Sequence, residues 1–134
     1  MQMDDAETAF ETARADIEAG RRTPPDVAAE AERTVLPFIH GAQARADALV
    51  RAATARASAA ARDRDGRVEN SRVPPELLAG LSQANRWEMC LAQYDDAWRM
   101  RVAGLRTGDA DRVADGDARA DAAIRSAVTM LTGS

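Results

Sequence analysis

Reactive side chains are scarce in this chain of 134 residues, which has one cysteine, one histidine and no lysine. Cys90 and His40 are too few for a zinc finger, an intrachain disulfide framework or a histidine-rich di-iron bundle. No glycine-rich loop that could cradle a phosphate is present. No serine or cysteine nucleophile accompanies His40 in the sequence, and Cys90 is expected to be an inert buried thiol. We therefore predict a protein that is not an enzyme and that uses no metal and no cofactor.

Long apolar runs are missing as well. The longest, Val35 to Ile39, contains Pro37, whereas a membrane span needs roughly 20 apolar residues. This predicts no membrane-spanning segment. The chain opens without the features of a signal peptide, and a lone cysteine suits a reducing compartment. We expect a cytoplasmic protein; a mature exported domain that has lost its signal peptide is the alternative.

Positive charge is outweighed by negative charge. The 18 basic residues, all of them arginine, stand against 22 acidic residues, which gives a net charge of −4. An acidic domain does not suit nucleic acid as its main partner. We therefore expect no nucleic-acid binding by the domain as a whole.

Helix-forming residues are abundant. Hydrophobic residues make up 46% of the chain and charged residues 30%, and alanine is the most frequent of the hydrophobic residues. Alanine, arginine, glutamate and leucine all have high helix propensities. No segment shows the alternation of polar and apolar residues that marks a strand. The composition therefore predicts an all-α fold.

Capping residues and prolines divide the chain into four predicted helices. Thr23 is placed to cap a helix whose first residue is Pro24, and Pro37 is expected to kink that helix. Thr107 and Gly108 form a break, after which Asp109 can cap the last helix. The predicted helices span about residues 4–20, 24–64, 74–106 and 110–132.

Four helices joined by short turns predict one antiparallel bundle domain over residues 1–134. The second and third helices form a hairpin about 50–60 Å long, at 1.5 Å per residue. Both shorter terminal helices fold back onto the same end of it, so the hairpin should extend beyond them. A trial register pairs Val35 with Leu105, Phe38 with Val102, Ala42 with Trp98, Leu49 with Leu91 and Ala53 with Trp87. Each tryptophan then faces an alanine, as dense packing requires.

The far end of the hairpin, about residues 52–84, is predicted to be a bare two-helix arm. Such an arm buries little apolar surface and is marginal by itself. We therefore expect it to contact a second copy, another protein or, by bending, the body of its own chain. The residues predicted for this interaction arm are Arg51, Arg56, Arg62, Arg64, Leu77, Leu78 and Leu81. The resulting functional hypothesis is a non-catalytic interaction and assembly module that self-associates through its central hairpin.

A small-molecule-binding bundle is the alternative function. Trp87, Tyr94 and Trp98 share one face of the third predicted helix and could line a pocket for a flat ligand. In the trial register, Arg45 faces Asp95. The residues predicted for this pocket are Trp87, Glu88, Leu91, Tyr94, Asp95, Trp98 and Arg45. The competing interpretation is that the aromatic residues are core and the charges form inter-helix salt bridges.

Two further charge patterns point to binding less directly. The arginines of the arm could contact phosphates, which makes a nucleic-acid-associated arm a third alternative. Asp63, Asp65 and Glu69 interrupt that basic patch, and no aromatic residue is interleaved with it. Five aspartates crowd the start of the last helix without the ligand spacing of a calcium loop. Most of them are expected to complement the helix dipole, but Asp117 is in line with apolar residues of that helix.

Overall fold

The computed structural model describes residues 1–62 and 65–132. It contains helix α1 (Met3–Glu18), helix α2 (Pro24–Ala61), a short 3-10 turn η1 (Asn70–Arg72), helix α3 (Pro75–Thr107) and helix α4 (Ala110–Thr132). The described residues contain no strand. The predicted all-α class is therefore confirmed.

Local chemistry explains where the helices begin and end. The Asp26 amide donates to the Thr23 hydroxyl at 3.3 Å, so Thr23 caps α2 as predicted. Gly108 ends α3 with a φ of 70°, a conformation that glycine adopts without a steric penalty. The Arg112 amide donates to Asp109 Oδ1 at 3.1 Å and caps α4. Helix α2 is a single helix through Pro37, and the kink expected there stays a prediction.

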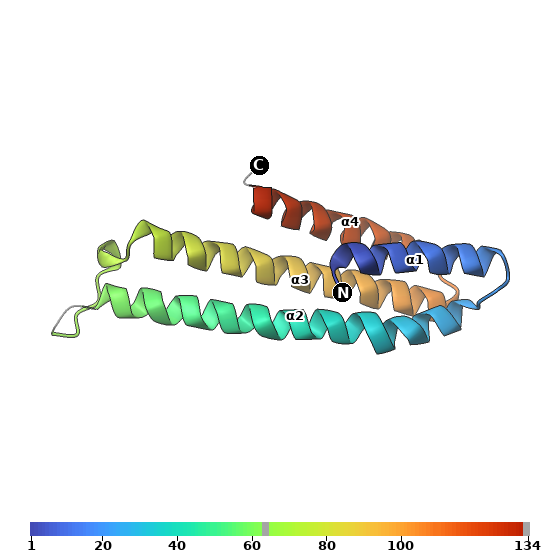
Figure 1. The fold of residues 1–134 in the computed structure, drawn as a ribbon, viewed down its shortest axis with the longest axis horizontal. Helices are drawn as coiled ribbons and strands as arrows, with labels where there is room; N and C mark the ends of the chain where they lie inside the picture. The colour runs from blue at the N-terminus through green and yellow to red at the C-terminus, as the bar shows by residue number, and fades with distance from the viewer. Residues whose placement is uncertain (63–64, 133–134) are drawn as a thin grey trace.

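Figure 1 shows how the four helices share the molecule. Helices α2 and α3 form a long antiparallel hairpin. Helices α1 and α4 lie against one end of this hairpin and stop short of the other, where α2 and α3 continue to the turn around η1. We call the end that holds all four helices the body, and the hairpin segment of residues 52–84 the arm.

Helices α3 and α4 approach each other most closely at two glycines. A Cβ atom added at Gly116 would come within 2.8 Å of the Ala97 carbonyl oxygen, and one at Gly104 within 2.6 Å of Val113 Cγ2. Real Cβ atoms do not tolerate such contacts. These two glycines therefore allow the two backbones to approach closely.

The body contains the main core. Phe10 from α1, Val35 and Ile39 from α2, and Tyr94 and Trp98 from α3 are buried in it, with alanines from every helix between them. The Phe10 and Trp98 rings meet edge to face with their centroids 5.1 Å apart. Towards the arm the core becomes thin, and only alanines with Val73 and the half-buried Leu77 remain.

The register of the hairpin differs from the trial register. Leu91 packs against Ala42 and Ala46, whereas Leu49, its predicted partner, is 56% exposed. Ala42 belongs to this Leu91 cluster and not to the cluster that contains Trp98. Small alanines hold the interface between α2 and α3 because they let the two backbones approach, and Leu49 is displaced to the rim of that interface.

Candidate functional site

The aromatic pocket predicted from the sequence is not formed. Leu91, Tyr94 and Trp98 are sealed inside the core with at most 2% of their surface exposed. Trp87 lines a large open groove, whereas Trp98 borders only a small pocket of about 40 Å³. Glu88 is half-buried and lies outside the lining of that groove. The prediction of a ligand pocket across this face is therefore wrong, because two of its aromatic walls pack against α1.

The predicted pairing of Arg45 with Asp95 is also wrong. Asp95 is only 8% exposed, and it lies 3.2 Å from His40 Nε2 and accepts from Arg99 Nε at 2.8 Å. Arg45 is exposed and forms no ion pair with the described residues. His40 lies more than one helical turn before Arg45, so the error follows from the register. Arg99, four residues after Asp95, binds the carboxylate oxygen of Asp95 that His40 does not contact.

A different polar cluster lies at the centre of the body, around Arg101 of α3. The side chain of Arg101 is almost completely buried, with 4% of its surface exposed. Its two terminal nitrogens each donate to one oxygen of Glu7 from α1 at 2.8 Å. Its Nε donates to Asp117 Oδ1 of α4 at 2.9 Å. The Tyr94 hydroxyl donates to Glu7 Oε2 at 2.8 Å, and Arg14 also pairs with Asp117.

Aromatic rings complete the surroundings of this guanidinium. The Arg101 Cζ atom lies 4.4 Å from the centroid of the Phe10 ring and 4.8 Å from that of the Trp98 ring. Arg14 covers Phe10 at 4.4 Å as well. Cation–π contacts of this kind strengthen when the charge is desolvated. The cluster therefore provides Arg101 with two carboxylates and two aromatic rings in place of water.

The protonation states follow from this environment. Burial opposes ionisation of Asp117, but the hydrogen bonds and charges of Arg14 and Arg101 outweigh it and lower the pKa of Asp117. Burial, helped by the neighbouring Glu7 carboxylate, raises the pKa of Tyr94. Burial also raises the pKa of the Cys90 thiol. Arg101 is thus ionised, Tyr94 is a neutral donor and Cys90 is a poor nucleophile.

The Arg101 cluster is built to hold α1 in place. The two terminal nitrogens of Arg101 bind the two carboxylate oxygens of Glu7. Helix α1 supplies both Glu7 and Phe10, which packs against the Arg101 guanidinium. Arg14 and Asp117, at the edge of the cluster, border an open pocket, and the buried Nε of Arg14 has no hydrogen-bond partner. Sequence reasoning missed Arg101, although its position three residues after Trp98 places it on the aromatic face. The alignment of Asp117 with apolar residues was the one sequence signal for the cluster.

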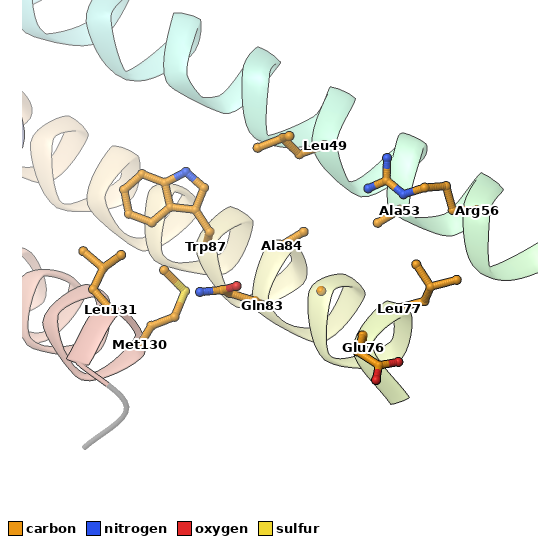
Figure 2. A pocket seen from close by; sticks show the side chains of 11 residues that line it. Leu49, Ala53, Arg56, Glu76, Leu77, Gln83, Ala84, Trp87, Met130 and Leu131 are labelled. Atoms are coloured by element: carbon orange, nitrogen blue, oxygen red, sulfur yellow. The ribbon is translucent and has the colours of Figure 1, made fainter. Parts of the chain in front are cut away.

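The open groove lies beside the arm and has a volume of about 520 Å³. Figure 2 shows side chains from three helices around it, with Leu49 and Ala53 on α2, Ala84 and Trp87 on α3, and Leu131 on α4. Arg56 and Glu76 carry the charges of the groove and lie towards the tip of the arm, on either side of Leu77 (Figure 2). We call this space the arm groove. Its lining residues are Leu49, Ala53, Arg56, Glu76, Leu77, Gly80, Gln83, Ala84, Trp87, Met130 and Leu131.

The residues predicted for the interaction arm divide between two faces. Arg56 and Leu77 line the arm groove. Arg62, Leu78 and Leu81 line a second groove of about 390 Å³ on the other side of the α2–α3 interface, which we call the back groove. Arg51 is outside both linings and pairs with Asp47 at 2.6 Å. Arg64 lies outside the described residues.

Nowhere in residues 1–62 and 65–132 do three histidine, cysteine, aspartate or glutamate side chains gather as a metal site requires. Of the helices that the structure describes, none combines the length and the apolar character needed to cross a bilayer. Comparisons with protein-family models, with curated proteins and with solved structures give no match.

Proposed function

We propose that this protein is a non-catalytic helical assembly module that self-associates through its central hairpin. The observation that carries the proposal is the apolar arm groove, which α1 and α4 leave uncovered beside the hairpin. Large exposed apolar patches on small proteins usually mark contact surfaces.

The distribution of exposed apolar side chains supports an interface near the arm. Leu131, at the end of α4, is 73% exposed, and Leu49 on α2 is 56% exposed. Both line the same groove, together with the half-buried Trp87. Tryptophan surrounded by aliphatic side chains is a common centre of protein interfaces.

The chemistry of the buried groups supports a non-catalytic role. The ionisable side chains of the Arg101 cluster hydrogen-bond to one another, and the thiol of Cys90 is buried. His40 contacts Asp95 and Arg99, and neither of these can serve as a nucleophile that His40 would activate.

The test of self-association is the mass of the chain in solution. Sedimentation equilibrium or light scattering over a wide range of protein concentrations should show a reversible increase from one copy to two. A mass of one copy at every concentration, up to the highest that stays in solution, would contradict the proposal.

A further inference from the structure

The arm groove is the continuation of the track that α1 follows in the body. There, α1 lies against all three other helices: Glu7 binds Arg101 of α3, Arg14 binds Asp117 of α4, and Phe10 packs with Val35 of α2. The arm groove has walls from the same three helices. The two sites adjoin, because Met3 at the start of α1 packs against the cluster that includes Trp87, and Trp87 lines the groove. The groove is therefore a vacant fourth-helix position of the bundle.

Towards the tip of the arm, a second helix position beside the hairpin is open, the one that α4 occupies in the body. Met130 and Leu131, at the end of α4, reach the level of Gln83 and Trp87 on α3 (Figure 2). Residues 75–82 of α3 lie beyond the level that the described part of α4 reaches (Figure 1). In the part of the chain that the structure describes, two helix positions are thus open on the same face of the α2–α3 hairpin.

We infer that the arm of a second copy fills these two positions, an inference that rests on the proposed self-association. A single helix would fill one position and leave the other open, whereas a helical hairpin fills both. The arm of a second copy is such a hairpin, and its own two vacant positions are filled by the same contact. A contact that satisfies both copies in this way is isologous and closes at two copies.

The relative direction of the two arms follows from the bodies. Helix α1 protrudes on the face that carries the groove, since it occupies the same track. With parallel arms, the two copies of α1 would compete for the same space. Antiparallel arms place the two bodies at opposite ends of a four-helix bundle that consists of two copies of α2 and two of α3.

The charges of the groove suit a second copy better than a strongly charged partner. Its lining has one cation, Arg56, and one anion, Glu76, and neither forms an ion pair with any residue that the structure describes. The same face of a second copy is also mostly apolar and carries no net charge, so it brings no excess charge of either sign to the groove. A strongly acidic or strongly basic helix would leave one of the two charges facing its like.

The first experiment compares two faces of the arm by single substitutions at exposed leucines. Leu49→Glu and Leu131→Glu place a charge in the arm groove, and Leu78→Glu is the matched control in the back groove, where Leu78 is 48% exposed. Circular dichroism and sedimentation equilibrium are measured for each variant. We expect all three to stay helical, the two groove variants to raise the dimer dissociation constant about tenfold or more, and Leu78→Glu to leave it unchanged.

The outcomes separate this inference from the proposed function. A wild-type chain that is monomeric throughout contradicts both. A dimer that Leu78→Glu disrupts and the groove variants do not would overturn the arm-groove assignment while the self-association stands. Growth of the mass beyond two copies would overturn the closed exchange of arms.

The second experiment tests the direction of the arms. Val68, in the turn at the tip, is exposed and can be changed to cysteine for spin labelling in a chain that also carries Cys90→Ser. Pulsed distance measurements between the two tip labels of a dimer should give roughly 20 Å or more, since in each copy about eight residues of α2, from Ala53 in the arm groove to Ala61, separate the groove from the tip at about 1.5 Å each. Tip labels in contact would indicate parallel arms and overturn the antiparallel arrangement.

Discussion

Arg101 occupies a place where an unpaired guanidinium would be costly. A buried charge that loses its partner typically destabilises a protein by roughly 3–5 kcal/mol. In the structure Arg101 keeps two carboxylates, Glu7 and Asp117, at hydrogen-bond distance. Because Glu7 comes from α1 and Asp117 from α4, this one residue connects three helices.

A double-mutant cycle at Glu7 and Arg101 tests this clamp. Glu7→Leu should cost about 3 kcal/mol of unfolding free energy, because Arg101 keeps only Asp117. In the double variant with Arg101→Met the loss should be smaller than the sum of the single losses by more than about 1 kcal/mol. Urea unfolding of the wild type, the two single variants and the double variant measures the cycle, and Arg45→Met, at an exposed position, serves as the control. Additive effects would show that Glu7 and Arg101 are not coupled.

Asp117 should contribute to stability in a pH-dependent way. Its pKa is lowered in the folded chain, so the folded state holds the charged form more strongly than the unfolded state does. That contribution is complete above the ordinary aspartate pKa of about 3.9 and is lost as the pH falls through the lower folded value. Asp117→Asn should therefore cost about 1 kcal/mol near neutral pH and progressively less below about pH 4.

Unfolding free energies of wild type and Asp117→Asn across this range check the sign. The exposed Asp115 lies two residues before Asp117, on another side of α4, and provides the control variant Asp115→Asn. A difference between wild type and Asp117→Asn that stays constant down to the acid transition would contradict the assigned pKa direction.

Tyr94 gives a second titration with the opposite sign. Burial raises its pKa, so the folded chain keeps the phenol neutral where an unfolded chain would ionise it, and stability should fall as the pH rises above about 10. The chain has a single tyrosine, so phenolate absorbance reports on this residue alone. We expect ionisation to coincide with the loss of helical circular dichroism. Ionisation near pH 10 in a chain that is still folded would contradict the sealed position of Tyr94.

At the scale of the helices, the contact between α3 and α4 depends on Gly116. Alanine has a higher helix propensity than glycine by about 1 kcal/mol, so a replacement in an open position should stabilise the helix. At Gly116 the new methyl group would meet the Ala97 carbonyl oxygen, and we expect Gly116→Ala to destabilise the chain by about 1–3 kcal/mol.

Gly41 is the matched control for this prediction. It also lies within a helix, but an added Cβ would meet only the flexible end of Arg45 at 3.5 Å. Gly41→Ala should be neutral or stabilising by up to about 1 kcal/mol. Thermal unfolding of both variants gives the comparison, and equal melting temperatures for the two would show that the close approach at Gly116 is not required.

Helix ends were predictable because they depend on neighbours in the sequence. Thr23 and Gly108 act through their own backbone surroundings, and the structure shows both as predicted. The sequence could not determine which of two adjacent alanine-rich stripes of α2 faces α3. Leu49 looked suitable as a core residue, but the smaller Ala46 permits the closer approach of the backbones and takes that position.

The polar partners were harder to predict for the same reason. Pairing of Asp95 with Arg45 assumed a register that is wrong by more than one turn, and His40 lies at the correct level instead. Arg101 was overlooked because arginine is rarely buried. Its partners Glu7 and Asp117 are 94 and 16 residues away in the sequence, and only the folded bundle brings them together.

The whole molecule is uneven, with a well-packed body and a thinly packed arm. If a second copy covers the arm, the folded dimer is favoured by mass action, so the melting temperature should rise with protein concentration. Leu49→Glu should remove this dependence and Leu78→Glu should keep it. Scanning calorimetry over a hundredfold range of concentration would measure it. A melting temperature that does not change with concentration in wild type would argue against a dimer coupled to folding.

The two tryptophans, Trp87 and Trp98, lie on opposite sides of this division. Trp98 is 2% exposed, and Arg101 and Phe10 pack against its ring, whereas Trp87 borders the arm groove. Each can be studied alone after replacing the other with phenylalanine. A small soluble quencher should have little effect on the fluorescence of Trp98 at any protein concentration. The fluorescence of Trp87 should be quenched in dilute solution and protected from the quencher when a second copy covers the groove. The fluorescence of Trp87 is therefore an intrinsic signal for dimer formation.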